Sequence, residues 1–255
     1  DGVNEVKSSI VEVPVLSGNA IRGVLRRIGA IDFLEKIGYE GRIFSEFTQK
    51  TDDSLVQKKR LTDSVYYAFF SGGALEKGST QDYIEVGKKK EFRKMIPFLS
   101  LFGTAFQNQV LQGCLKVDIG IPICSETAYY TKVESHISFY DLLAEIYYTR
   151  RDDIEDKQIE RKEQMKYTTE CLIAGTVLSH GFVLEDVTEV EESCFGAIMR
   201  RFEKQPFLGG KSGVGHGLVQ LKYEPEWPGE ELYNDYLSEN RKEILDYVQE
   251  LESKI

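Results

Sequence analysis

Near the start of the chain, apolar residues recur with helical spacing. They stand at i, i+3, i+4 and i+7: Ile21, Val24, Leu25 and Ile28. This spacing predicts a short amphipathic helix that begins in the cap-forming Ser17-Gly18-Asn19 and leaves several arginines off the apolar stripe. A second helical stretch is expected over about 30–38.

Other segments alternate in polarity or carry β-branched runs. We expect an edge strand over 8–16, where Pro14 stands near its end, and a helix or buried turn over 96–106. The later strands are predicted at 113–124, within 172–187 and at 218–223, the last of which reads LVQLKY. A helix is predicted over 194–204, and the highly charged 147–167 is read as a solvated protrusion.

The order strand, helix, strand, strand, helix, strand predicts an α+β fold with a ferredoxin-like (RRM-like) core. A strand should also precede the first helix; it is either short here or outside this sequence. The length suits one elaborated domain over 1–255. We expect insertions at about 39–96 and 125–168 and an acidic C-terminal extension over 224–255.

Charge is unevenly distributed along the 255 residues. The formal net charge is −10, which weakens the case for nucleic-acid binding, but basic residues gather at 21–27, 57–60, 87–94 and in GGKSGVGHG at 209–217. Cys114, Cys124, Cys171 and Cys194 form no CxxC pair, so free thiols are expected and a zinc site is not. With no long apolar run or signal peptide, the protein is expected to be soluble and cytoplasmic.

Three motifs occur in a fixed order. PVLSGNAIRGVLRR is followed by IPFLSLFGTAF with its LFG segment and, near the end, by FLGGKSGVGHGLVQLKY. In this order they resemble the RAMP superfamily of CRISPR proteins. Within that superfamily the chain looks most like the Cas seven family, the backbone subunits that polymerise along CRISPR RNA (crRNA). The SGNAIRG form is closest to type IV and type I-D members.

The resemblance implies the partners and the outline of the molecule. They are crRNA, target nucleic acid (DNA more than RNA), further copies of the chain and other CRISPR effector subunits, with no membrane. One insertion would form a basic finger region, and the other a projecting thumb with Tyr147 and Tyr148 at its base.

RNA contacts are expected in three places. The helix N-terminus offers backbone N–H groups to a phosphate, the 87–94 run offers flexible charge, and the glycine-rich loop can follow a sugar-phosphate chain. The loop is not a Walker A motif, because its lysine precedes most of the glycines. The candidate RNA-binding residues are Ser17, Asn19, Arg22, Arg26, Lys88, Lys89, Lys90, Arg93, Gly209, Gly210, Lys211, Ser212, Gly213, Gly215 and His216.

We expect a non-catalytic scaffold that needs no cofactor or metal, because no cysteine or histidine carries a catalytic signature and the clustered carboxylates at 152–156 fall in a polar insertion. Two alternatives stay open. One is an endoribonuclease of the same superfamily that processes CRISPR precursor RNA, with His216 as its candidate base near the loop. The other is a protein-interaction scaffold that binds no nucleic acid.

Overall fold

The computed structural model describes residues 11–39, 61–73, 86–106, 109–149 and 166–253. Contacts divide the chain into two compact units. The first joins residues 1–16 to 119–181, and the second joins 17–118 to 182–255. The predicted insertion at 125–168 falls within the first unit.

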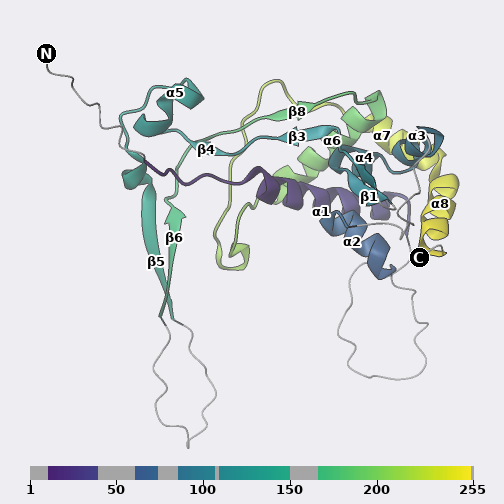
Figure 1. Ribbon diagram of the computed structural model, residues 1–255, viewed down its shortest axis with the longest axis horizontal. Coiled ribbons are helices and arrows are strands. Elements are labelled where there is room, and N and C mark those ends of the chain that lie inside the picture. Colours follow the sequence, from purple (N-terminus) through teal and green to yellow (C-terminus); the bar gives the residue numbers. More distant parts are fainter. Residues whose placement is uncertain (1–10, 40–60, 74–85, 107–108, 150–165, 254–255) are drawn as a thin grey trace, which may run out of the picture. The chain divides into compact units, whose positions relative to one another are not determined.

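The second unit contains most of the helices (Figure 1). They are α1 (Gly18–Lys36), α2 (Asp63–Ser71), α3 (Val86–Met95), α4 (Pro97–Phe102), α6 (Glu189–Lys204), α7 (Glu231–Glu239) and α8 (Arg241–Ser253), with the 3-10 turn η3 (Ser212–Val214). Helices α1, α4 and α6 contact one another pairwise. The core between them consists of fully buried aromatic and aliphatic side chains such as Phe33, Phe98, Leu99 and Ile198.

Helix α1 is one continuous helix over the two stretches predicted separately. Ser17 caps its N-terminus, with the side chain accepting a hydrogen bond from the Asn19 N–H. Ile21 and Leu25 of the predicted stripe are buried. No proline interrupts the sequence after position 28, so the helix runs on to Lys36.

Helix α6 begins at Glu189, earlier than the predicted 194, because Thr188 and Glu191 form a capping box. The Thr188 hydroxyl accepts from the Glu191 N–H at 3.3 Å, and the Glu191 carboxylate accepts from the Thr188 N–H at 2.7 Å. The extra turn carries Glu191 into a buried position, where it is 1% exposed.

The acidic extension predicted over 224–255 is folded as α7 and α8. Their apolar faces are buried through Tyr233, Leu237, Ile244, Val248 and Leu251. Helix α7 contacts α6, and α8 contacts α3 (Figure 1). The charged side chains therefore cover one face of a packed helix pair.

The strands are short and pair antiparallel in twos. In the second unit β1 (Thr104–Phe106) pairs with β2 (Gln109–Leu111), and β3 (Leu115–Val117) pairs with β8 (Phe182–Leu184). In the first unit β4 (Ile121–Pro122) pairs with β7 (Leu178–Ser179), and β5 (Leu143–Thr149) pairs with β6 (Lys166–Leu172).

The first unit also contains the short helix α5 (Ala128–Thr131) and the 3-10 turns η1 (Ser125–Thr127) and η2 (Phe139–Leu142). Its small core is formed by Cys124, Phe139 and Leu142, against which Val13, Leu143 and Leu172 pack.

These elements make a mixed α+β fold. The predicted strand at 113–124 is two short strands, because the chain leaves the β8 ladder after Val117 and resumes pairing at Ile121 with β7. The prediction of a paired strand at 218–223 is wrong. Within the described residues this segment forms a single β-bridge, between Leu218 and Phe207. The ferredoxin-like core stays a prediction, since the described pairs do not join into a four-stranded sheet.

None of the described helices is both long enough and apolar enough to span a membrane.

Candidate nucleic-acid interface

The N-terminus of α1 presents two of the predicted residues to solvent. Ser17 and Asn19 are both exposed, and the Ser17 hydroxyl accepts a hydrogen bond from the Asn19 N–H at 3.2 Å. Gly18 between them is buried, and a Cβ there would lie 2.6 Å from the Val117 carbonyl oxygen. The close approach of the 117–118 backbone thus fixes the first turn of α1, while its polar flanks stay accessible.

Arg22 and Arg26 point into the second unit. Arg22 donates to the carbonyl oxygens of Leu115 at 2.5 Å and Phe102 at 2.6 Å. Arg26 is 7% exposed and donates to Ala68 at 2.7 Å, to Phe102 at 2.9 Å and to Gly103. The two guanidinium groups therefore bind the carbonyl groups where α4 ends and β3 begins. RNA contact by either arginine stays a prediction.

Burial lowers the pKa of Arg22, and burial together with the charge of Arg22 lowers the pKa of Arg26 to about 10. Both groups stay protonated at neutral pH. Each also lies over the Phe102 ring, at 5.8 Å for Arg22 and 5.7 Å for Arg26. Gly103 follows Phe102 with a φ of 66°, which a residue with a side chain rarely adopts.

Helix α3 separates the predicted basic run into two groups. Lys88, Lys89 and Lys90 are exposed. Arg93 instead forms a two-pronged pair with the buried Glu191, at 2.9 and 2.7 Å, and donates to the Asp186 carbonyl oxygen. Phe92 is 3% exposed and packs in the core, so it does not present a face for base stacking. The lysines are the part of this run that is open to a ligand.

The sequence-based candidates omitted Lys94, which belongs to the same run. Its side chain lines a cavity of about 360 Å³ together with those of Lys90, Arg93 and Tyr236. The Tyr236 hydroxyl donates to the Lys94 carbonyl oxygen at 2.8 Å, which ties α7 to the end of α3. The sequence shows Lys94 as one of the basic residues of the 87–94 run. The cavity that it lines could not be predicted, because Tyr236 of α7, far away in sequence, forms part of its wall.

The glycine-rich loop is closed at its base and open at its tip. Leu208 N–H donates to the Gly217 carbonyl oxygen at 2.8 Å, and Phe207 bridges Leu218. Gly217 has a φ of 79° and its missing Cβ would overlap the Leu208 backbone, so the base requires glycine.

At the tip, Lys211 adopts a φ of 61° and leads into η3. Lys211, Ser212 and Gly213 are exposed, and His216 is half-buried. The space where a Cβ would stand is empty at Gly209, Gly210, Gly213 and Gly215. A molecule can therefore approach the backbone of all four closely.

Tyr147 of the predicted thumb is exposed on β5, and its hydroxyl donates to Glu145 at 2.7 Å. Tyr148 pairs with Tyr167 in the β5–β6 register. The charged part of the predicted protrusion at 150–165, like the basic 57–60, lies outside the described residues.

No family model and no curated protein sequence matches this chain. Among solved structures, 51 chains match. One of them comes from a structure titled "Type IV-B CRISPR Complex", with a TM-score of 0.52 and 22% identity, over 86% of this chain and 81% of that chain. At this identity the likeness is one of fold.

Proposed function

We propose that this chain is a non-catalytic backbone subunit of a CRISPR effector ribonucleoprotein, of type IV or a related type I. Its copies would lie side by side along the guide region of crRNA and leave the bases free to pair with target nucleic acid. The observation that carries the proposal is the fold likeness to a chain of a type IV-B CRISPR complex, which extends over most of both chains.

The glycine-rich loop supports RNA as the ligand. Its four open glycines leave the backbone bare, and Lys211 adds a positive charge at the exposed tip. Bare backbone amides beside a cation suit a phosphate group, whatever the base attached to it. Binding of this kind would be independent of sequence, as a subunit that holds many different guides requires.

The two other sites would supplement the loop. Ser17 and Asn19 lie at the positive end of the α1 dipole, and Lys88, Lys89 and Lys90 form the exposed side of α3. On this proposal specificity comes from base pairing, and the protein needs neither a cofactor nor a catalytic group. A ferredoxin-like core completed by further strands belongs to the same proposal.

The test is binding of fluorescent single-stranded RNA across a salt series. Each phosphate contact that is lost should flatten the slope of log affinity against log salt by roughly 0.7. We therefore expect Lys88→Ala, Lys89→Ala and Lys90→Ala together to reduce the slope by about 2 and to weaken binding at least tenfold, with Lys211→Ala adding a smaller loss. Lys242→Ala, on the exposed acidic side of α8, is the matched control and should leave binding unchanged.

Three results would contradict the proposal. Cleavage of repeat RNA without added metal would point to the processing endoribonuclease. Failure to bind at low salt would leave the protein-interaction scaffold. Equal losses in the two single variants, Lys211→Ala and Lys242→Ala, would show that binding follows overall charge and not the proposed surfaces.

A further inference from the structure

The cavity of about 360 Å³ that Lys94 lines is enclosed by four elements of the second unit. Its walls come from the last turns of α3, the first residue of α4, the start of α6 and the middle of α7. A cavity of this volume is near the lower end of the range for ligand sites. It therefore suits a few side chains and not a whole domain surface.

Most polar groups of the lining are already engaged within the protein. Arg93 and Glu191 bind each other, and the Thr188 hydroxyl bonds to the Glu191 carboxylate at 3.1 Å. The Tyr236 hydroxyl donates to the Lys94 carbonyl oxygen. These four side chains therefore need no ligand to satisfy them.

The two lysines of the lining are different. Lys90 and Lys94 are exposed, and among the described residues neither forms an ion pair with a carboxylate. They stand four residues apart on α3, so they share one side of the helix with their Cβ atoms about 5–6 Å apart. The carboxylate of Glu191 in the same lining is taken up by Arg93. The cavity thus carries two positive charges that its own walls do not balance.

The remaining walls are apolar. Pro97 is buried, Val190 is half-buried, and the side chain of Tyr236 completes the lining. A ligand with both an apolar part and negative charges could bury the first against these walls and bring the second to the lysines. A small inorganic anion would use the lysines alone and leave the apolar walls uncovered.

Acidic residues around the cavity favour a polypeptide over a nucleic acid as the occupant. Glu189 and Asp235 are exposed next to the lining residues Val190 and Tyr236 in sequence. Burial, and then the charge of Glu243, raises the pKa of Tyr236. A nucleic acid has a negative charge on every nucleotide and would meet these carboxylates. A polypeptide can place its acidic residues at the lysines and neutral or basic ones elsewhere.

We propose that this cavity binds a short segment of another protein in which acidic side chains flank an apolar one. The apolar side chain packs against Val190 and Tyr236, and the carboxylates bind Lys90 and Lys94. Lys88 stands two residues from Lys90, about 200° around the helix, and so lies on a different side of α3. Segment binding therefore does not depend on the proposed RNA contact of α3, with which it shares only Lys90.

The test begins with the selection of phage-displayed random peptides on the full chain at low salt. We expect the enriched peptides to combine acidic residues with an apolar one, and a labelled copy to bind more weakly as salt rises. Fluorescence anisotropy should show Lys94→Ala weakening this binding about tenfold, since a charge-assisted hydrogen bond is lost. The matched control is Lys88→Ala, which removes the same charge from the same helix and should change peptide binding less than about twofold. For single-stranded RNA the order of the two variants should reverse.

A second variant tests the apolar walls without touching the lysines. Val190→Glu places a carboxylate in the cavity, at the start of a helix where acidic residues are favourable, and should weaken peptide binding about tenfold or more. Urea denaturation would check that it keeps its stability. Enrichment of basic or uncharged peptides, equal losses in Lys94→Ala and Lys88→Ala, or full binding by Val190→Glu would overturn the proposal. RNA binding that fell about tenfold in Lys94→Ala, with no acidic peptide enriched, would assign the cavity to RNA instead.

Discussion

Arg26 shows how one charged side chain can organise a core. Its guanidinium group is almost fully buried and binds carbonyl oxygens of Ala68, Phe102 and Gly103, from the end of α2 and the end of α4. Among the described residues, no carboxylate accepts a hydrogen bond from this guanidinium group. The carbonyl groups instead provide the compensation that a buried charge requires.

Replacing Arg26 by alanine should therefore unfold the protein more easily. The change removes a buried donor group and leaves several carbonyl oxygens unpaired, which costs about 3 kcal/mol in the free energy of unfolding. Urea denaturation would measure it. Arg27→Ala is the control, because Arg27 is exposed on the same helix and its loss should stay within about 0.5 kcal/mol. Equal effects of the two variants would contradict a structural role for Arg26.

The sequence could predict α1 but not the direction of its arginines. The apolar stripe at 21, 24, 25 and 28 follows the helical period, so the helix and its buried side were readable. Arg22 and Arg26 stand off that stripe and therefore suggest a solvated surface. Their carbonyl partners at 102–103 and 115 are distant in sequence, and only the packing of α1 against α4 and β3 brings them together.

At the scale of elements, Glu191 joins the start of α6 to α3. The same carboxylate closes the capping box with Thr188 and pairs with Arg93. Burial raises its pKa, but hydrogen bonds from Arg93, Ser100 and Thr188 and the charge of Arg93 outweigh this, so the pKa is lowered overall from 4.5. The sequence T-E-V-E could have shown the capping box, whereas the partner on α3 could not be read from it.

A lowered pKa makes stability depend on pH. Because the folded protein holds Glu191 ionised more strongly than the unfolded chain does, the stabilisation is complete above about pH 4.5 and is lost as the pH falls through the lower, folded-state pKa. We expect Arg93→Met to lower the stability at pH 7 and to flatten this part of the pH profile, measured by urea denaturation at each pH.

The exposed pair of Lys116 and Glu185 provides the control for that experiment. Both side chains are 53% exposed. Solvent screens such a pair, so Lys116→Met should leave the pH profile close to that of the unmodified protein. If Arg93→Met kept the full pH dependence, Glu191 would not be its source.

At the scale of the whole molecule, the C-terminal region belongs to the second unit. The acidic composition of 224–255 suggested an extension, but the apolar residues between the acids are spaced for helices that bury one face. Tyr233 is fully buried against the polar groups of α1 and α6, and its backbone N–H donates to the Ser193 hydroxyl at 3.0 Å. The acidic composition reflects the exposed side of these two helices. It does not reveal the apolar side chains that they bury.

Ending the chain after Glu230 should consequently damage the whole second unit. The truncation removes α7 and α8 and uncovers apolar side chains on α1, α3 and α6. We expect loss of cooperative thermal unfolding and increased binding of a hydrophobic dye at room temperature. Ending it after Ser253 instead should have a small effect, because this keeps the buried Glu252, whose carboxylate accepts hydrogen bonds from the Tyr39 hydroxyl and the Thr62 N–H. A truncated protein that still unfolded cooperatively near the original temperature would show that these helices are an appendage.

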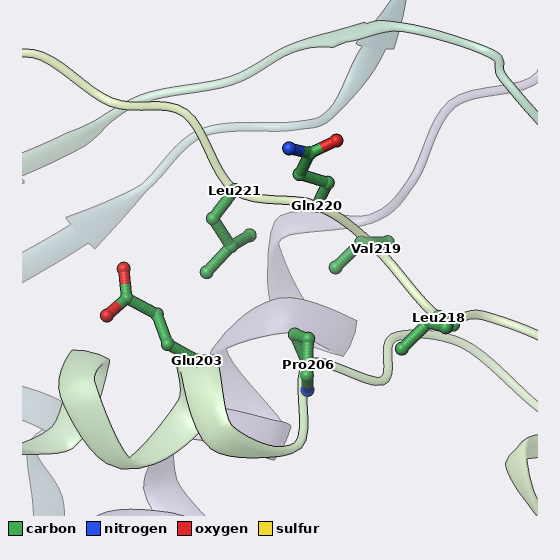
Figure 2. Close-up of a pocket in the computed structure, with 6 residues that line it drawn as sticks. All are labelled: Glu203, Pro206, Leu218, Val219, Gln220 and Leu221. Carbon is green, nitrogen blue, oxygen red and sulfur yellow. The ribbon is translucent and has the colours of Figure 1, made fainter.

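The chain has a single tryptophan, Trp227, and its position gives the molecule an optical reporter. The indole ring lies 4.8 Å from Tyr223 and 5.9 Å from Phe195, and its N–H donates to Glu203 at 2.7 Å. Glu203 also lines a cavity of about 470 Å³ together with Pro206 and Leu221 (Figure 2). Tryptophan emission from this protein, excited at a wavelength that the tyrosines do not absorb, thus arises at one place, and its wavelength registers the polarity around Trp227 without any attached dye.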